Sequence, residues 1–277
     1  PYGRIDVRHD PQSFFDGVYF SPHKFLGGPG AAGILIIHER VYRSDLAPTC
    51  GAGGTVDFVS ADEQAYSPDI ETREKPGTPG ILQVIKAALA MQLKEMLGLE
   101  RIEQRDRKLI GRALARFQGH PNIEVLGNPN PERRLAICSF NVRAGDAYLH
   151  PRFVVRLLND LFGIQSRAGC SCAGPYGHRL LGIDRQTSHL YKEKILHGDV
   201  GLKPGWCRVG FHYLLTDEEF DFICQAVEFV ADHGLLFLPL YRFDLHTGAW
   251  VHRDGDPACG QGDLRGCIEA EMDGQRA

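Results

Sequence analysis

The sequence predicts an α/β fold, because short apolar runs typical of strands alternate with long segments of helical periodicity. Residues 34–37 are an Ile-Leu-Ile-Ile run that indicates a buried strand, and residues 17–20 have the composition of a second one. Apolar residues recur at every third or fourth position between Leu82 and Met96, as on one face of a helix. A chain of 277 residues is also long enough to bury a substantial core.

Capping signals define the helix boundaries. Thr78 as an N-cap and Pro79 in the first turn predict a helix that ends at Gly98. Thr216, with a glutamate three residues later, forms a capping box, which predicts a helix that ends before Gly234. Periodic apolar residues predict two further helices, over residues 102–117 and 153–162.

The rest of the chain divides into strands, a connection and a tail. Residues 135–142 and 206–211 have the composition of strands. Residues 184–205 show little periodicity, which predicts a long connection. The sequence beyond Asp254 is polar and glycine-rich, which is typical of disorder. We therefore expect one domain over residues 1–100, a second over 101–240, and a tail over 241–277.

The composition favours a small substrate. The formal charge is −4, from 31 basic and 35 acidic residues, which gives no electrostatic basis for binding nucleic acid or an acidic membrane surface. The eight cysteines are too scattered for a disulfide framework and indicate a reduced, cytoplasmic protein. We find no apolar run of the length expected for a membrane span, and no signal peptide.

The glycines at positions 28, 30 and 33 have the spacing of a dinucleotide-binding loop. That motif requires a helix after its last glycine, whereas the residues that follow, 34–37, predict a strand. A Walker-type phosphate loop requires Lys and then Ser or Thr at positions 34 and 35, which are Ile and Leu here. The sequence therefore predicts a glycine-rich turn between two strands, and neither nucleotide motif.

A polar corner precedes this turn and contains Ser21, His23 and Lys24. A lysine amine in an apolar pocket walled by glycines has a lowered pKa, so it can condense with an aldehyde and later act as a base. Ser21 and His23 can bond a phosphate group. The alternatives are that Lys24 is a solvated turn residue and that the other two side chains only satisfy the turn.

Four motifs together resemble those of the class V (fold type I) pyridoxal-phosphate enzymes, the group of cysteine desulfurases and selenocysteine lyases. Ser-x-His-Lys followed by Gly-Gly-Pro at residues 21–29 resembles the cofactor segment of that family. Residues 51–55 are similar to its glycine-rich Thr turn, and residues 73–79 to its Glu-x-Gly-Thr-Pro helix start. Residues 167–175 resemble the Arg-x-Gly-x-x-Cys-Ala-x-Pro segment of one desulfurase branch. The resemblance covers roughly residues 17–235.

The resemblance implies a role for each candidate residue in the cofactor site. Lys24 would hold pyridoxal 5′-phosphate as an imine, and Ser21 and His23 would bind its phosphate. Thr55 would reach the phosphate of the other subunit of a homodimer; the alternative is that it is only a hairpin residue.

The resemblance also implies two residues that act on the substrate. Cys172 would accept the sulfur as a persulfide, and Arg208 would hold the substrate carboxylate. The alternatives are a small buried thiol at Cys172 and a structural salt bridge at Arg208. A metal site formed by Cys170, Cys172 and His178 is not expected, because C-x-C lacks the usual ligand spacing.

The predicted function is that of a pyridoxal-phosphate enzyme that removes sulfur or selenium from a small amino acid, with a sulfur-acceptor protein as a candidate partner. Another class V reaction, such as transamination or a different β-elimination, and a catalytically silent chain that dimerises or binds a partner are the alternatives. The family's upstream stacking ring, acid and first phosphate loop have no counterpart here. We therefore expect residues 1–100 to be the remainder of the large cofactor-binding domain, residues 101–240 to be the smaller α/β domain, and this chain alone to be inactive.

Overall fold

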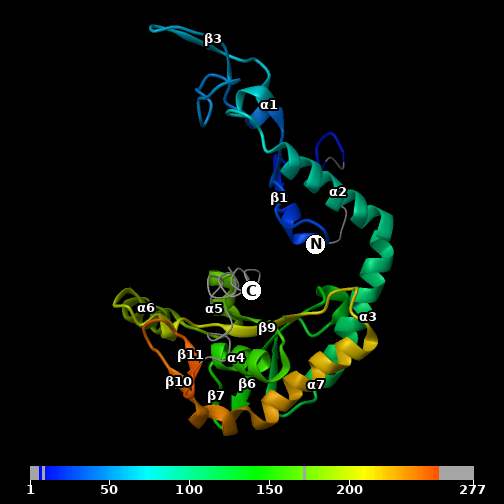
Figure 1. Ribbon diagram of the computed structural model, residues 1–277, viewed down its shortest axis with the longest axis vertical. Coiled ribbons are helices and arrows are strands. Elements are labelled where there is room, and N and C mark those ends of the chain that lie inside the picture. The colour runs from blue at the N-terminus through cyan, green and yellow to red at the C-terminus, as the bar shows by residue number, and fades with distance from the viewer. Residues whose placement is uncertain (1–5, 8–9, 171–172, 256–277) are drawn as a thin grey trace, which may run out of the picture. The chain divides into compact units, whose positions relative to one another are not determined.

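The computed structural model describes residues 6–7, 10–170 and 173–255 (Figure 1). The chain forms two compact units, Pro1–Glu103 and Gln104–Ala277. The division falls inside the helix α3 (Leu99–Phe117), whereas the sequence placed a domain boundary between residues 100 and 101.

The described residues of the first unit form two antiparallel strand pairs and two α-helices, followed by the first turn of α3. The elements of this unit, in chain order, are β1 (Gly17–Phe20), η1 (Pro22–Lys24), β2 (Ile34–Ile37), η2 (Glu39–Val41), β3 (Val56–Val59), β4 (Gln64–Tyr66), α1 (Ile70–Arg73) and α2 (Ile81–Leu97). The strands β1 and β2 pair antiparallel, as do β3 and β4. The two strands predicted on either side of the glycine turn are therefore confirmed.

The helix α2 begins later than its capping signals predicted. Its N-cap is Gly80, whereas the sequence predicted Thr78, and it ends at Gly98 as expected. The Gly77 N–H donates to the carbonyl of Gly53, which ties the preceding chain to a neighbouring turn. Residues 78–80 therefore serve as the connection between that turn and the helix.

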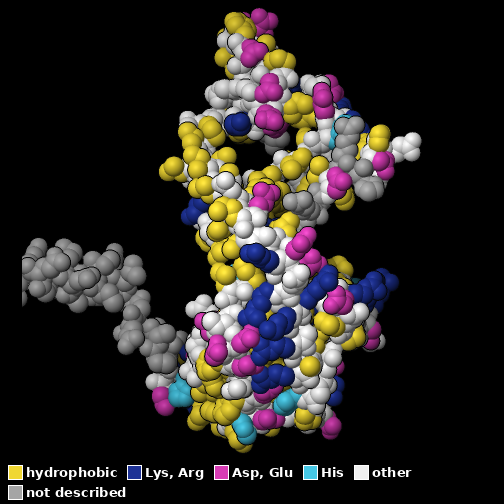
Figure 2. All heavy atoms as spheres, turned by 90° about the vertical axis from the view of Figure 1, so that its right-hand side faces the viewer, with side chains coloured by type: hydrophobic (Ala, Val, Ile, Leu, Met, Phe, Trp, Pro, Cys, Tyr) yellow, Lys and Arg dark blue, Asp and Glu magenta, His cyan; other side chains and the backbone are white. Residues whose placement is uncertain are grey.

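The apolar side chains of the first unit lie largely at its surface. Figure 2 shows them as exposed hydrophobic side chains in the upper half of the view. Leu35 of β2 is 66% exposed, and Leu82 and Met96 of α2 are 77% and 76% exposed. The buried residues of α2 are Ala87 and Ala90. Residues 34–37 do form a strand, but the prediction that this strand is buried is wrong for the described unit. Its apolar side chains point away from the packed interior.

The second unit is built on an antiparallel sheet with the strand order β5-β6-β9-β8 and with β7 paired to β6. Its strands are β5 (Ile123–Leu126), β6 (Ile137–Ala144), β7 (Ala147–Tyr148), β8 (Arg167–Gly169) and β9 (Trp206–Gly210). The helices α3, α4 (Pro151–Phe162) and α7 (Asp217–His233) contribute the apolar residues of the core against one face of this sheet (Figure 1). The predicted helices and strands of this region are confirmed to within two or three residues.

Alternation along β9 decides which of its side chains face the core. Cys207 and Val209 are buried and lie directly opposite Phe140 and Cys138 of β6. Because successive side chains of a strand point to opposite faces, Trp206, Arg208 and Gly210 belong to the face that the core helices leave uncovered.

The helix α7 begins with the predicted capping box. Thr216 Oγ1 accepts a hydrogen bond from the Glu219 N–H at 3.1 Å, and the Glu219 carboxylate accepts one from the Thr216 N–H at 2.8 Å. Together with η5 (Gly234–Leu240), α7 is long and apolar enough to pass for a membrane span, which the sequence did not lead us to expect. Its inner face, which includes Phe220 and Val230, is buried in the core of this unit. A helix that packs into a protein core can have the same length and apolar composition as a membrane span.

Two segments contain structure that the sequence did not predict. The supposed connection over 184–205 contains α6 (Arg185–Leu196) and η4 (Val200–Leu202), and α5 (Gly174–Leu180) lies just before it. The helix α6 buries no residue and is capped by Asp184, so it has no apolar stripe to reveal it. The supposed tail begins with a hairpin of β10 (Tyr241–Phe243) and β11 (Trp250–His252). Packing of the Trp250 ring on Phe153, with centroids 4.7 Å apart, explains why residues 241–252 are ordered.

Candidate active site

Ser21, His23 and Lys24 lie together in the turn η1, directly after β1. The Lys24 N–H donates to the Ser21 carbonyl at 3.1 Å, and the buried Pro22 opens the turn. The side chains of His23 and Lys24 are exposed and that of Ser21 is half-buried. None of the three side chains forms a hydrogen bond or ion pair with the part of the chain that the structure describes. The turn therefore presents an amine, an imidazole and a hydroxyl group that are not used internally.

Glycines close the chain over this turn. A Cβ atom at Gly28 would overlap the Pro22 carbonyl oxygen and lie 3.0 Å from that of Phe25, so no other residue fits there. Gly27 and Gly30 have φ values of 75° and 84°, which favour glycine. The glycines therefore serve a tight return from η1 to β2, in agreement with the rejection of a dinucleotide loop.

The surroundings of Lys24 differ from the apolar pocket that we expected, because its side chain is exposed. The lysine with a perturbed environment in this region is Lys94 of α2, whose ammonium group lies 5.0 Å from the centre of the Phe25 ring. Burial lowers the pKa of Lys94. Lys94 is therefore the alternative to Lys24 as the reactive lysine, and an experiment has to distinguish the two.

Thr55 lies in a separate turn of the same unit, immediately before β3. Its side chain is fully buried, and its hydroxyl donates to the Ala52 carbonyl at 2.7 Å. This geometry agrees with the alternative of a turn residue, and the phosphate contact of Thr55 stays a prediction. The hydrogen bond between Gly77 and Gly53 places the glycine-rich Thr turn beside the Gly-Thr-Pro segment.

Arg73 and Glu74 tie the end of α1 (Ile70–Arg73) to the loop over residues 42–49, a role that the sequence did not reveal. The buried guanidinium of Arg73 donates to the carbonyls of Ser44 and Leu46. The Glu74 carboxylate accepts a hydrogen bond from the Tyr42 hydroxyl at 2.7 Å, which lowers the pKa of Glu74. Both residues belong to the motif over residues 73–79, but that motif does not specify which groups they bond.

Arg208 is a half-buried residue of β9 in the second unit. It lies directly opposite Ser139 of β6 and Arg167 of β8. Its guanidinium forms no hydrogen bond or ion pair with any residue in the described ranges. The alternative role, a structural salt bridge, therefore has no acidic partner among those residues. An anionic ligand would supply the negative charge.

Cys172 and its neighbour Ser171 lie outside the described residues. The segment that contains them leaves β8 at Gly169 and enters α5 at Gly174, and the Ala173 N–H donates to the Cys170 carbonyl at 3.0 Å. Cys170 has an exposed thiol.

The buried thiols are poor candidates for sulfur transfer. Burial raises the pKa of Cys138 and Cys224 to about 12 and raises that of Cys207 even further. These thiols stay protonated at neutral pH, and the thiolate is the nucleophile. Among the cysteines that the structure describes, Cys50 and Cys170 have exposed thiols.

The predicted absence of a metal site concerned Cys170, Cys172 and His178. His178 bonds the Gly174 carbonyl at 2.9 Å and the Ser188 hydroxyl at 3.0 Å, which joins α5 to α6. In the ranges with described coordinates, no three His, Cys, Asp or Glu side chains gather in a metal-binding arrangement.

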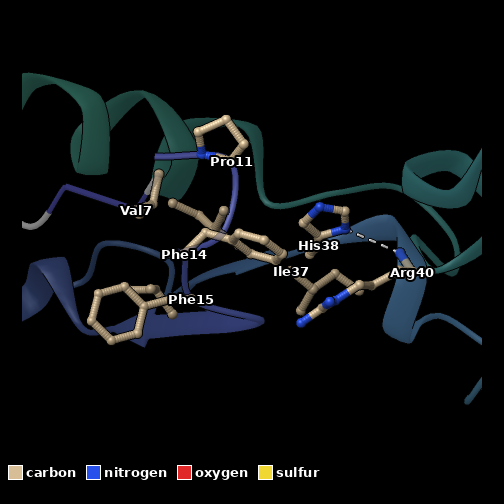
Figure 3. Close-up of a pocket in the computed structure, with 9 residues that line it drawn as sticks. Val7, Pro11, Phe14, Phe15, Ile37, His38 and Arg40 are labelled. Carbon is tan, nitrogen blue, oxygen red and sulfur yellow. Dashed lines mark hydrogen bonds between the residues drawn. The ribbon is translucent and has the colours of Figure 1, made fainter. Parts of the chain in front are cut away.

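A pocket of about 400 Å³ in the first unit lies apart from these residues (Figure 3). Phe14 and Phe15 line it, together with His38 and Arg40. The Arg40 guanidinium lies over the Phe14 ring and pairs with the Asp16 carboxylate. No predicted site residue lines this pocket.

A comparison with protein families gives the assignment that these motifs predicted. The model of the family described as "Aminotransferase class-V" matches residues 6–223. The chain belongs to this family. The family predicted from the four motifs is therefore confirmed.

Several similar proteins are described as cysteine desulfurases. A probable cysteine desulfurase of Staphylococcus epidermidis is 30% identical over 197 residues, which cover 70% of this chain and 45% of that protein. A cysteine desulfurase of Cronobacter sakazakii is 32% identical over 172 residues, or 62% of this chain and 39% of that protein. The apo structure of a cysteine desulfurase from Thermococcus onnurineus NA1 matches with a TM-score of 0.62 and 28% identity, over 78% of this chain and 47% of that one. The chain therefore spans about half the length of the relatives that it matches, and it shares the fold type I α/β architecture.

Proposed function

We propose that this protein is a pyridoxal-phosphate-dependent enzyme that removes sulfur from cysteine. The observation that carries the proposal is the turn η1, in which Ser21, His23 and Lys24 offer three side chains that bond to none of the residues with described coordinates. The similarity to proteins described as cysteine desulfurases supports the choice of reaction.

The donor set of this turn fits the cofactor. The Lys24 amine can condense with an aldehyde, and the Ser21 hydroxyl and the His23 imidazole can donate hydrogen bonds to a phosphate. Pyridoxal phosphate, when bound, supplies an electron sink that stabilises negative charge at the substrate α-carbon. Lys24 would hold the cofactor and, once released, move a proton at that carbon. Thr55 would contribute to phosphate binding across a homodimer.

The second unit would supply the groups that act on the substrate. Arg208 would bind the carboxylate of a small amino acid through its planar guanidinium, for which the described chain offers no competing partner. The Cys172 thiolate would attack the substrate sulfur as the bond between that sulfur and Cβ breaks. The sulfur would stay on Cys172 as a persulfide, and the carbon fragment would take up a proton at Cβ and leave as alanine. A sulfur-acceptor protein would then receive the sulfur. The same residues would serve selenocysteine as substrate.

A reducing, cytoplasmic location agrees with the state of the thiols. The described cysteines at positions 50, 138, 170, 207 and 224 are free, and three of them lie in the core.

The experiment that tests the function is to incubate the holoenzyme with cysteine and a thiol reductant and to measure alanine and sulfide. We expect equal amounts of both products, and none from a Lys24→Ala enzyme. Formation of pyruvate and ammonia would instead indicate a β-elimination enzyme.

A further inference from the structure

Ser139 of β6 and Arg208 of β9 belong to a row of residues that crosses the sheet of the second unit. Ser139 lies directly opposite Arg208, which itself lies opposite Arg167 of β8. The neighbours of Ser139 along β6, Cys138 and Phe140, are buried in the core. Because successive side chains of a strand point to opposite faces, Ser139 shares with Arg208 the face that is turned away from the core.

The hydroxyl group of Ser139 finds no acceptor among its neighbours in this row. Ser139 is half-buried, and its side chain forms no hydrogen bond with the part of the chain that the structure describes. On the β5 side it lies opposite Leu126, whose buried side chain has no polar atom. On the β9 side it lies opposite Arg208, whose guanidinium donates hydrogen bonds but accepts none. The Ser139 O–H is therefore available to a ligand.

The two side chains are close enough to contact one small group. Residues directly opposite each other in an antiparallel pair have Cβ atoms about 4.5–5.5 Å apart. Both side chains offer donors, so a ligand that satisfies them must bring acceptor oxygens, and the charge of Arg208 favours a negative group. A carboxylate has about four acceptor positions, and an arginine that binds it through two parallel hydrogen bonds occupies two of them. A position is left for the Ser139 hydroxyl.

We propose that Ser139 is a substrate-binding residue that donates a hydrogen bond to the α-carboxylate held by Arg208. Donors on two adjacent strands then hold the carboxylate from two directions. A ligand that lacks this group loses both contacts, so the pair selects α-amino acids over the corresponding amines. This inference deepens the proposed function and rests on its assignment of Arg208.

A pair of ligands that differ only in the carboxylate tests the contact. The holoenzyme is titrated with L-alanine and with ethylamine, and binding is followed by the absorption of the bound cofactor. In Ser139→Ala the Kd for L-alanine should rise about tenfold, because a hydrogen bond to a charged group contributes that much or more. The Kd for ethylamine should stay within about twofold of the parent, since ethylamine has no carboxylate. Ser139→Thr keeps the hydroxyl group and should bind L-alanine within about threefold of the parent.

The matched control is Ser166→Ala, which removes another serine hydroxyl of the same unit. Its Oγ atom is buried and has no partner among the described residues, so its loss should leave both Kd values at the parental level. Parental affinity for L-alanine in Ser139→Ala would overturn the proposal. An equal loss of affinity for L-alanine and ethylamine would also overturn it, because the effect would then lie in the fold or at the cofactor. So would a loss that Ser139→Thr does not recover.

The titration separates this inference from the proposed function, because it requires no sulfur chemistry. If the parent releases no sulfide from cysteine while Ser139→Ala weakens the binding of L-alanine alone, the proposed reaction fails and the carboxylate contact stands. If the parent releases sulfide and Ser139→Ala binds L-alanine like the parent, the contact fails and the reaction stands. In an active enzyme, Ser139→Ala should raise the KM for cysteine about tenfold and change kcat by less than about twofold.

Discussion

Arg208 of β9 lies directly opposite Arg167 of β8 in the antiparallel register, so the two arginines share one face of the second sheet. Like charges in directly opposed positions destabilise a sheet, and Arg208 has no ion-pair partner among the described residues. A bound carboxylate would compensate this charge. The arrangement therefore favours a ligand-binding role over a structural one for Arg208.

Replacing Arg208 should weaken substrate binding more than it weakens the fold. Arg208→Lys keeps the charge but loses the planar pair of donors, so we expect the KM for cysteine to rise about tenfold or more. The free energy of unfolding should change by less than about 0.5 kcal/mol, because no described interaction is lost. Steady-state kinetics and denaturant unfolding measure the two effects. Arg143→Lys, at an exposed position of β6, is the control and should leave KM unchanged. A parental KM in Arg208→Lys would contradict the assignment.

Cys172→Ser should abolish sulfide release from cysteine and leave the absorption of the bound cofactor unchanged. The substitution removes the nucleophile but none of the groups assigned to cofactor binding. Selenium release from selenocysteine should be less affected, because selenium is the better leaving group. Cys170→Ser is the matched control and should have the smaller effect, since only Cys172 occupies the cysteine position of the motif. Sulfide release at the parental rate in Cys172→Ser would exclude the persulfide role.

Acidification should destabilise the second unit through His150, the N-cap of α4. Its Nδ1 accepts hydrogen bonds from the Arg152 N–H at 3.2 Å and from Trp250 Nε1–H at 3.1 Å, and its Nε2 bonds the Gly201 carbonyl at 3.0 Å. Burial lowers the pKa of His150, so the folded protein favours the neutral ring. The stabilisation is present above the unfolded pKa of about 6.5 and is lost as the pH falls toward the lower folded value.

Thermal unfolding between pH 7.5 and 5 measures this effect. His150→Asn keeps a cap acceptor but does not titrate, so its melting temperature should fall less on acidification than that of the parent. His246→Asn alters a largely exposed histidine of the neighbouring turn and should behave like the parent. Equal pH dependence in His150→Asn and the parent would contradict this account.

The exposed face of α2 should promote self-association of the isolated chain. Leu82 and Leu89 project from it, whereas Ala90, about 100° around the helix from Leu89, is buried. The double substitution of Leu82 and Leu89 by Glu should reduce association and binding of a hydrophobic dye, and it should change the melting temperature little. Ala90→Glu should instead destabilise the unit, because it buries a charge. Analytical ultracentrifugation and thermal unfolding distinguish the two outcomes, and strong destabilisation by the double substitution would show that this face is packed.

Much of the fold was predictable because its elements carry local signals. The capping box at Thr216 and the β-branched run after Gly33 predicted α7 and β2 from neighbouring residues alone. Periodicity, however, identifies an apolar face without stating what covers it, so the exposure of Leu82 was not predictable. The helix α6 was missed because a polar cap, and not a buried stripe, defines it.

The candidate site was likewise predictable only in part. The motifs placed Ser21, His23 and Lys24 in one turn, and the structure confirms that they lie together there. The packing of Trp206 of β9 against Gly177 of α5 was not predictable, because Gly177 is distant from Trp206 in sequence and belongs to no cofactor motif. Contacts of this kind appear only when the chain is folded.

The most direct test of the account is the identity of the lysine that binds the cofactor. The holoenzyme is reduced with borohydride, digested and mapped by mass spectrometry, so that the pyridoxyl group marks the lysine that held it. We expect the adduct on Lys24, and we expect Lys24→Ala to lose the visible absorption of the bound cofactor while Lys94→Ala retains it. An adduct on Lys94, which lies over the Phe25 ring, or on any other lysine would contradict the assignment of η1 as the cofactor site.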